Sequence, residues 1–412
     1  MTVHPSSQFS SVATKHAAQR KFDFRSDTLT QPTDEMFDVM KAASRGDDVY
    51  GEDASVRALE AKVARLTGHE AGLFCVSGTM TNQLAFKAAC LPPPSSVLCD
   101  ARSHVFRYEA GGLAANSQLT VYPVQAQQNG GHHITVEDIE RHFIPDDQDV
   151  HMAPTRIISL ENTRDGTILP LDEIRRIRDF CDAHKHQGIR LHMDAARAWD
   201  AAAATAAAAN NGQNDLASLG QALQEITGLC DSASLCLSKG IGAPIGSVLV
   251  GSHDFIRKAR HFRKQFGGGW RQAGGLAAAA DWCLDHVWPK MATETHVLAQ
   301  RLALGLEQRG RFKITVPVET NMVFIDVRGS GIGLAQLSQR LEEEANILIG
   351  NRNATSDQTA ARLVLHWQIT PEAVDAFLDV VERLSREAAP EHFVNDPSKG
   401  TTNLETSVYA SR

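Results

Sequence analysis

A single lysine, Lys239, stands between the apolar run SASLCLS (232–238) and the glycine-rich segment GIGAPIG (240–246). An ammonium group at the end of a buried strand is costly unless it is paired or neutralised, and a neutral lysine amine can condense with a carbonyl group. Most lysines that follow a strand simply extend into solvent. Lys239 is therefore a candidate nucleophile whose assignment depends on its neighbours.

A second segment carries groups that suit the same chemistry. The stretch LHMDAAR (191–197) ends a predicted strand with Asp194 and places Arg197 shortly after it. In open α/β sheets, ligands bind at the carboxyl ends of the strands, and an aspartate there can pair with the protonated ring nitrogen of pyridoxal phosphate. A helix-capping Asp followed by a surface Arg would give the same local pattern.

A phosphate site is predicted at Ser77, Gly78 and Thr79, where a strand leads into a helix within CVSGTMTNQLAF (75–86). Backbone N–H groups at a helix N-terminus bind phosphate, although an N-capped turn without a ligand looks similar. These residues, Asp194 and Lys239 would meet the phosphate, ring nitrogen and aldehyde of one cofactor. The three segments together predict a pyridoxal-phosphate site.

These segments require a sheet that brings strand ends together. Short apolar runs at 73–76, 96–100, 156–162, 189–194, 232–238 and 246–251 are typical of buried strands. Helical periodicity follows or separates several of them, as at 53–66 and 172–186. The alternation predicts an α/β domain whose mostly parallel, seven-stranded sheet is covered by helices.

The pattern changes after Trp288, where helices at about 290–309, 334–346 and 372–387 alternate with strands at 322–327 and 361–367. We expect a smaller α+β C-terminal domain over 289–390, a large domain over 22–288 that includes the N-terminal segment 22–52, a disordered arm over 1–21 and a flexible tail over 391–412. The alanine-biased segment 201–214 is predicted to be a surface insertion, because it lacks large apolar side chains for a core.

Composition excludes several classes of protein. A net charge of -8 gives no basic excess for nucleic acid, and no run approaches the roughly 20 apolar residues of a membrane span. The seven cysteines lack the paired spacing of metal ligands, so we predict no metal site and a reducing, cytoplasmic location. The Ser-rich, basic first 21 residues also fit a mitochondrial presequence.

The chain closely resembles the threonine aldolase family of pyridoxal-phosphate enzymes, which have the fold type I architecture of aspartate aminotransferase. The resemblance extends from about residue 22 to residue 388. It is carried by the motifs FRSDTLTQPT (24–33), DDVYGED (47–53), SGTMTNQ (77–83), SHVFRYEAGG (103–112), SLENTRDG (159–166), HMDAAR (192–197), CLSKGIGAPIGSVLVG (236–251), FGGGWRQAG (266–274) and RLVLHW (362–367).

The resemblance implies how the cofactor would be held. Lys239 would carry pyridoxal phosphate as an internal aldimine, and Asp194 would pair with the pyridine nitrogen. Gly78 and Thr79 would hold the phosphate, and Arg271 would reach the same group, often from the neighbouring subunit. The family also forms homodimers or homotetramers whose active sites are shared between subunits.

The resemblance further implies how the substrate would be bound. Ser26, Arg197 and Arg362 match residues that bind the amino acid's carboxylate, for which a planar guanidinium is apt. His104 would stack over the cofactor ring, and His151 would lie near the substrate hydroxyl. Further candidates at the site are Glu109, Tyr50 and Arg102, with a helix-surface role as the alternative for Glu109.

The implied reaction is retro-aldol cleavage of L-threonine or L-allo-threonine to glycine and an aldehyde, with a histidine, acting directly or through a water, as the base. Fungal alanine racemases resemble the same family, and two departures keep that activity open. Ala195 replaces a usual glycine, and Leu365 replaces a common threonine. A catalytically silent relative that acts as an interaction protein is the second alternative, which the retained Lys239, Asp194 and Arg362 disfavour.

Overall fold

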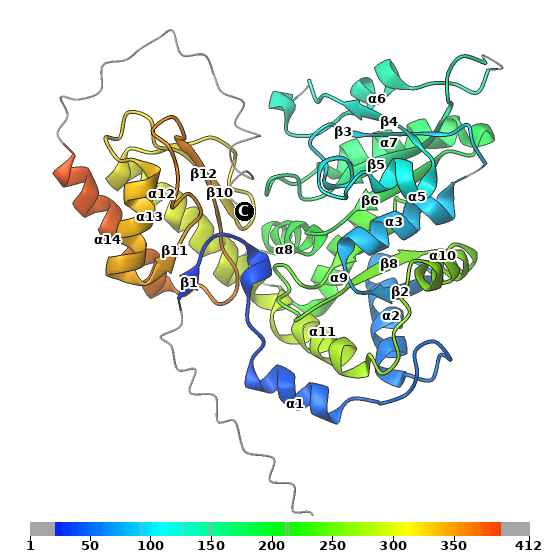
Figure 1. Ribbon diagram of the computed structural model, residues 1–412, viewed down its shortest axis with the longest axis horizontal. Helices are drawn as coiled ribbons and strands as arrows, with labels where there is room; N and C mark the ends of the chain where they lie inside the picture. Colours follow the sequence, from blue (N-terminus) through cyan, green and yellow to red (C-terminus); the bar gives the residue numbers. More distant parts are fainter. Residues whose placement is uncertain are drawn as a thin grey trace, which may run out of the picture.

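The chain folds into two lobes of unequal size, which Figure 1 shows side by side. The computed structural model describes residues 21–388 except positions 91, 128, 148, 149, 211 and 213. Apart from Lys21, the predicted N-terminal arm lies outside the described residues, as does the whole predicted tail. Within the described part of the chain, no helix combines the length and the hydropathy needed to cross a membrane.

A seven-stranded sheet forms the centre of the larger lobe. Its strand order is β2-β8-β7-β6-β5-β3-β4, and every neighbouring pair is parallel except the two that involve β8. The strands are β2 (Ala71–Cys75), β3 (Ser96–Asp100), β4 (Thr120–Val124), β5 (Thr155–Glu161), β6 (Arg190–Asp194), β7 (Ser232–Cys236) and β8 (Ser247–Gly251). The predicted α/β sheet is confirmed.

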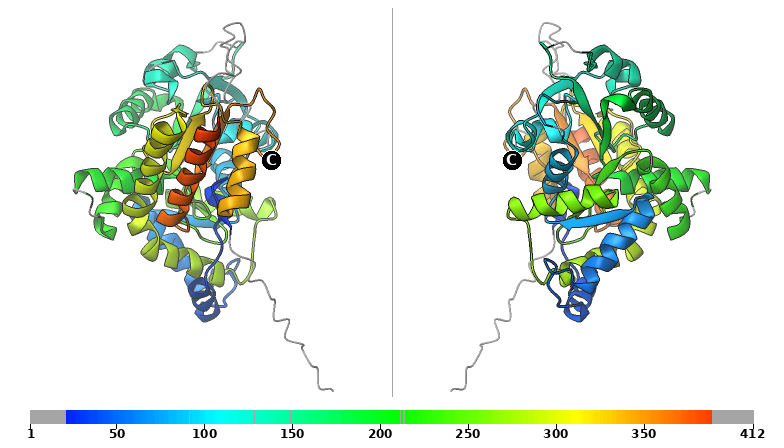
Figure 2. Two further views of the ribbon diagram at one scale, coloured as in Figure 1. Left: turned by 90° about the vertical axis from the view of Figure 1, so that its left-hand side faces the viewer. Right: turned by 90° about the vertical axis from the view of Figure 1, so that its right-hand side faces the viewer.

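Helices cover both faces of this sheet (Figure 2). Successive side chains of a strand point to opposite faces, so Leu73 and Cys75 pack with α3 and α10 whereas Phe74 packs with α2. The helices of this lobe are α1 (Asp34–Ala42), α2 (Ala54–Thr67), α3 (Gly78–Ala89), α4 (His104–Arg107), α5 (Gly112–Ser117), α6 (Val136–His142), α7 (Leu171–Ala183), α8 (Ala198–Ala209), α9 (Leu216–Thr227), α10 (His253–Gln265) and α11 (Gly274–His286).

The smaller lobe packs three helices against an antiparallel sheet of order β12-β10-β9. Its strands are β9 (Lys313–Ile314), β10 (Met322–Asp326) and β12 (Ala360–Val364), and its helices are α12 (Val297–Gly310), α13 (Leu334–Ala345) and α14 (Pro371–Glu387). The two lobes meet at a 3-10 turn (Trp288–Lys290) and a π-helix (Met291–His296), close to the predicted domain boundary.

The first residues of the N-terminal segment, 22–24, pack with the smaller lobe, whereas α1 of the same segment packs with the larger lobe through Met36. Strand β1 (Phe22–Asp23) pairs in parallel with β11 (Ile347–Leu348). Phe24 is buried in the core of the smaller lobe, with its ring centroid 5.5 Å from that of Phe377. Burial of this aromatic ring, rather than sequence position, decides the assignment.

The prediction of a surface insertion over 201–214 is wrong for its alanine-rich half. Residues up to Ala209 continue α8, and Ala201, Ala202 and Ala203 are completely buried. Small side chains allow α8 to approach α9 and the π-helix closely, so alanine fills this part of the core. Asn210 and Gly212, which follow the helix, lie in an exposed turn.

Candidate active site

A cleft between the two lobes is lined by half of the predicted site residues. Strand ends of the larger lobe form one side, and the N-terminal segment and β12 of the smaller lobe form the other. The residues that line the cleft are Ser26, Thr28, Arg102, His104, Tyr108, Glu161, Thr163, Arg164, Asp194, Ala196, Arg197, Lys239 and Arg362.

Lys239 lies in the loop that follows β7, at the carboxyl end of the sheet. The Leu237 N–H donates to the carbonyl of Gly246 at 2.9 Å, and the Gly242 N–H donates to the carbonyl of Lys239 at 2.8 Å. Gly246 has a φ of 117°, and a β-carbon there would lie 2.3 Å from the Phe74 ring. The glycine-rich segment therefore shapes the turn that presents Lys239 to the cleft.

Asp194 ends β6 and is only 3% exposed, yet it borders the cleft. Its Oδ2 accepts a hydrogen bond from the Asn82 amide at 2.8 Å, and its Oδ1 accepts one from the Ala196 N–H at 3.2 Å. The residue that caps α8 is Arg197, so Asp194 is not a helix cap. A buried carboxylate beside Lys239 is placed to bind a cationic group of a ligand.

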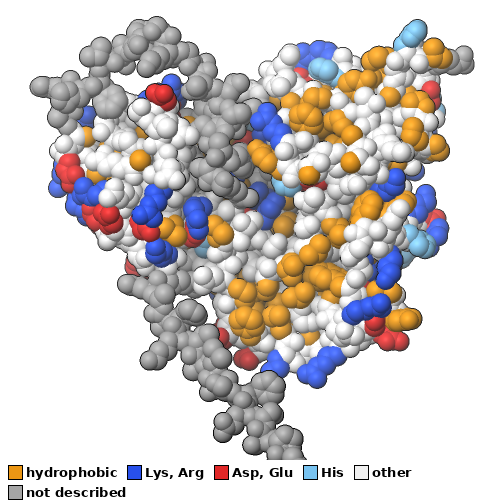
Figure 3. Space-filling model, viewed as in Figure 1, with side chains coloured by type: hydrophobic (Ala, Val, Ile, Leu, Met, Phe, Trp, Pro, Cys, Tyr) orange, Lys and Arg blue, Asp and Glu red, His pale blue; other side chains and the backbone are white. Residues whose placement is uncertain are grey.

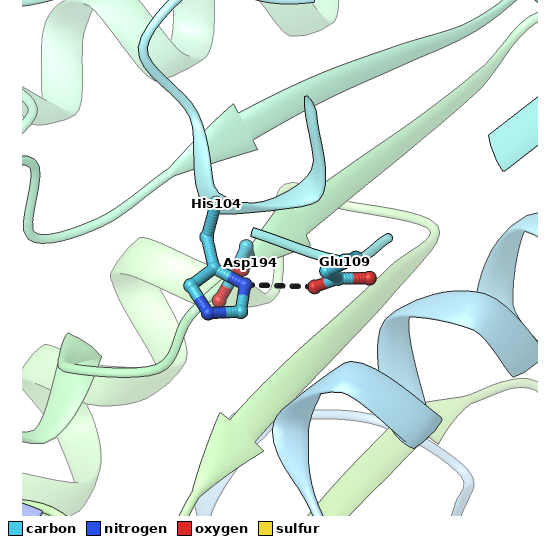
Figure 4. A group of neighbouring side chains, drawn as sticks. All are labelled: His104, Glu109 and Asp194. Carbon is cyan, nitrogen blue, oxygen red and sulfur yellow. Dashed lines mark hydrogen bonds and ion pairs between the residues drawn. The ribbon is translucent and has the colours of Figure 1, made fainter. Parts of the chain in front are cut away.

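His104 and Glu109 form a pair beside Asp194, as Figure 4 shows. The Nδ1 of His104 lies 2.9 Å from Oε1 of Glu109, which is 3% exposed, so the predicted alternative of a helix-surface role for Glu109 is wrong. Burial disfavours protonation of His104, but the Glu109 hydrogen bond and the Asp194 charge outweigh burial and repulsion from Lys239. The pKa of His104 is therefore raised.

Glu161 is a member of the cleft that the sequence analysis missed. It ends β5 directly beside Asp194 on β6, and its Oε2 accepts the His104 backbone N–H at 2.7 Å. Burial and the charge of Asp194 raise the pKa of Glu161, although Arg164 opposes the shift. The rule that identified Asp194, a polar residue at the end of a parallel strand, applies equally to Glu161.

Arg197 is held by a carboxylate that the sequence analysis also missed. Its Nε and Nη2 each donate to one oxygen of Asp27, both at 2.7 Å. Burial opposes the charge of Asp27, but the Arg197 guanidinium outweighs it and holds the pKa of Asp27 well below its usual range. The signal in the sequence was an acidic residue next to Ser26 within the motif FRSDTLTQPT, which carries part of the family resemblance.

Two other predicted carboxylate-binding residues also reach the cleft. The Oγ of Ser26 lies 2.9 Å from the Oγ1 of Thr28 at the start of a 3-10 turn (Asp27–Leu29). Arg362 projects from β12, and its Nη2 donates to the carbonyl of Arg25 at 3.4 Å. Arg197, Ser26 and Arg362 thus border one cleft from three segments that are distant in sequence.

The predicted phosphate residues lie at the start of α3. Ser77 caps this helix by accepting the Met80 N–H at 3.1 Å, and Gly78 and Thr79 form its first turn. The buried Ser247 hydroxyl has no hydrogen-bond partner among the described residues and lies 3.7 Å from where a β-carbon of Gly78 would be. Backbone donors and an unpaired hydroxyl fit a phosphate group, as Asp194 fits a pyridinium nitrogen and Lys239 an aldehyde.

Besides Ser77, Gly78, Thr79 and Glu109, three more predicted site residues are not among those lining the cleft, whereas Arg102 is. His151 lies on an exposed turn before β5. Arg271 is exposed and ion-paired with Asp47, with 3.1 Å between Nη1 and Oδ2. Tyr50 is 76% exposed. Arg102 borders the cleft and pairs with Asp100 at 2.8 Å.

Residues 23–330 match the sequence model of a family described as beta-eliminating lyase. The chain belongs to the beta-eliminating lyase family. The low specificity L-threonine aldolase of Saccharomyces cerevisiae is 43% identical to it over 354 residues, which cover 86% of this chain and 84% of the relative. The alanine racemase TOXG of Cochliobolus carbonum is 36% identical over 365 residues, covering 87% and 86% of the two chains.

Solved structures show the fold of this beta-eliminating lyase family member. A threonine aldolase from Leishmania major superimposes with a TM-score of 0.70 at 20% identity, covering 88% of this chain and 99% of that chain. A structure of SPT with its PLP internal aldimine gives a TM-score of 0.64 at 15% identity, covering 90% and 88%. The predicted fold type I architecture is confirmed.

Proposed function

We propose that this protein uses pyridoxal phosphate to cleave L-threonine and L-allo-threonine to glycine and acetaldehyde. The observation that carries the proposal is the convergence of Lys239, Asp194 and the His104–Glu109 pair at one cleft that Arg197 also borders. The similarity to low-specificity threonine aldolases supports this substrate class.

The residues of the cleft suit one cofactor pose. Lys239 would hold the aldehyde carbon, Asp194 the ring nitrogen, and the N-terminus of α3 the phosphate, to which Arg271 would add from a partner subunit. Bound there, pyridoxal phosphate supplies a sink for the electron pair released when a bond to Cα breaks. The anionic Asp194 favours a protonated ring nitrogen, on which that sink depends.

Arg197, Arg362 and Ser26 would bind the substrate carboxylate. Asp27 fixes the Arg197 guanidinium through two parallel hydrogen bonds, so the group is oriented before substrate arrives. A carboxylate held by Arg197 and Arg362 cannot rotate freely about the Cα atom. This restraint selects which bond to Cα is aligned for cleavage.

We assign the base to His104, acting directly or through a water. Its Nδ1 is occupied by Glu109, which leaves Nε2 to accept the proton of the substrate β-hydroxyl. Loss of that proton breaks the Cα–Cβ bond, the aldehyde departs, and a returned proton completes glycine. His151 would contribute only if subunit association brought it to the cleft.

Alanine racemisation is the second candidate, favoured by the similarity to a fungal alanine racemase. The two departures from the family motifs that are compatible with racemisation do not line the cleft. Ala195 and Leu365 are fully buried in the cores of the larger and smaller lobes, and Ala196 rather than Ala195 borders the cleft. We therefore place aldol cleavage first.

One experiment separates these functions. The protein is loaded with pyridoxal phosphate, incubated separately with L-threonine, L-allo-threonine and L-alanine, and the products are resolved by chiral chromatography. Glycine from either hydroxy amino acid supports the proposal and gives the diastereomer preference. D-alanine without glycine would move the assignment to racemase, and no product with any substrate would favour a silent interaction protein.

We also propose a homodimer or homotetramer. Hydrophobic side chains gather over the face of the larger lobe in Figure 3, and the exposed large ones of this lobe include Phe37, Tyr50 and Phe106. Arg271 and His151, which lie outside the cleft of one chain, would acquire roles at such an interface. Sedimentation as a monomer at micromolar concentration would contradict this proposal.

We propose that the protein is located in the cytoplasm. All seven cysteines are free, as expected in a reducing compartment. Cell fractionation with a mitochondrial marker tests this against the presequence alternative.

A further inference from the structure

The side chain of Asn82 on α3 lies between the two buried carboxylates beside the cleft. Its Nδ2 is 2.8 Å from Oε1 of Glu109 and 2.8 Å from Oδ2 of Asp194, and the residue is 1% exposed. Ionised carboxylates only accept hydrogen bonds, so each contact uses one of the two amide hydrogens. A single amide therefore bridges the acid paired with His104 and the acid beside Lys239.

A buried histidine fixes which way this amide points. The Oδ1 of Asn82 lies 3.2 Å from Nε2 of His192, whose Nδ1 lies 2.9 Å from the Ser232 hydroxyl. Because the amide oxygen can only accept, His192 donates from Nε2 and accepts from Ser232 at Nδ1. Burial lowers the pKa of His192 to about 4, so the ring is neutral and holds this arrangement at neutral pH.

The packing of α3 explains why the groups meet. His192 and Asp194 are two residues apart on β6, so they point to the same face of the sheet. Helix α3 lies against that face, and the Thr81 hydroxyl is 2.5 Å from the hydroxyl of Ser234 on β7. This contact helps to place the next residue, Asn82, within hydrogen-bonding distance of both carboxylates.

We propose that Asn82 is a positioning residue that keeps Asp194 turned toward the ring nitrogen of the cofactor and Glu109 turned toward His104. The identity of the cofactor rests on the proposed function. Without the Asn82 amide, each carboxylate loses a donor in a buried setting, and the cluster should bind a proton more tightly. His104 would take up that proton, since it faces Glu109 and Asp194 as well as Lys239 and Glu161.

The neighbouring Gln83 provides a matched control. Its Nε2 donates to the other oxygen of Glu109 at 2.6 Å, and its Oε1 accepts from Asn116 at 3.1 Å. No hydrogen bond joins it to Asp194 among the described residues. Of the two acids, removal of Gln83 therefore disturbs only Glu109, whereas removal of Asn82 disturbs both.

The experiment compares Asn82→Ala and Gln83→Ala with the unaltered full-length protein in two measurements. The first follows the His104 ring by NMR as a function of pH in protein without cofactor, with His104→Asn to assign the signal. The second measures the dissociation constant of pyridoxal phosphate. If Asn82→Ala does not fold, Asn82→Thr replaces it, because one hydroxyl hydrogen cannot serve both carboxylates.

The proposal expects Asn82→Ala to raise the pKa of His104 and to weaken pyridoxal-phosphate binding about tenfold or more. Gln83→Ala should raise the pKa of His104 but leave cofactor binding unchanged. Equal cofactor affinities for the two variants, or an unshifted His104 in Asn82→Ala, would overturn it. Both measurements are independent of product formation, so failure of the aldolase assay would refute the proposed function without deciding the role of Asn82.

Discussion

The carboxylate of Asp27 and the guanidinium of Arg197 form a two-point ion pair across 170 residues of sequence, with both N–O distances at 2.7 Å. Asn321 of the smaller lobe donates to the same carboxylate at 3.2 Å and to the carbonyl of Leu365 at 3.0 Å. Asp27 thus ties the N-terminal segment, the larger lobe and the smaller lobe together beside the cleft. A guanidinium fixed in this way has little freedom to lose when it binds a carboxylate.

The first prediction concerns this ion pair. Replacing Asp27 with Asn removes the charge that orients Arg197, so the KM for threonine should rise about tenfold or more, with a smaller change in kcat. Steady-state kinetics of glycine formation measures both parameters. Asp34→Asn, the same substitution at an exposed position in α1, is the control, and an unchanged KM for Asp27→Asn would contradict the positioning role.

The second prediction concerns pH. Protonated His104 cannot accept the hydroxyl proton, so kcat/KM should rise as the pH rises through the pKa of His104, which lies above the ordinary imidazole value. Glu109→Gln removes the hydrogen-bonded carboxylate that favours the protonated ring. The acid limb of the profile should then move to lower pH by about one unit. A limb that stays in place would show that another group is the base.

The third prediction tests the lysine assignment. Borohydride reduction of pyridoxal-phosphate-loaded protein should attach the cofactor irreversibly to the peptide that contains Lys239, and mass spectrometry should locate it there. Lys239→Ala should lose this label. Lys258 on the exposed side of α10 offers a control, since Lys258→Ala should retain it. The same labelled peptide in both variants would show that a different amine reacts.

The sequence predicts those parts of the site that depend on strand ends. Asp194 and Lys239 follow apolar runs, and parallel pairing of β6 and β7 brings the two positions to one edge of the sheet. Periodicity alone was sufficient for that step. The same rule applies to Glu161, which ends β5 opposite Asp194.

Other parts of the site depend on contacts that no local pattern encodes. Ser26 and Thr28 border the cleft because Phe24 packs into the smaller lobe and brings the N-terminal segment there, which also places Asp27 against Arg197. Asn82 matters because its two amide hydrogens meet two acids from separate segments. Pairings between residues so distant in sequence follow from tertiary packing, which a single chain's local spacing does not specify.

The last prediction tests whether α8 is a core element. Ala202 is completely buried where α8 packs, whereas Ala208 near the end of the same helix is exposed. Leucine has the same helical tendency at both sites, but at position 202 it must displace packed neighbours, which costs about 1–3 kcal/mol. Ala202→Leu should therefore unfold at lower denaturant concentration, and Ala208→Leu should match the unaltered protein. Equal midpoints for the two variants would restore the idea of a surface insertion, because only a helix free of close neighbours could accept leucine on either side without loss of stability.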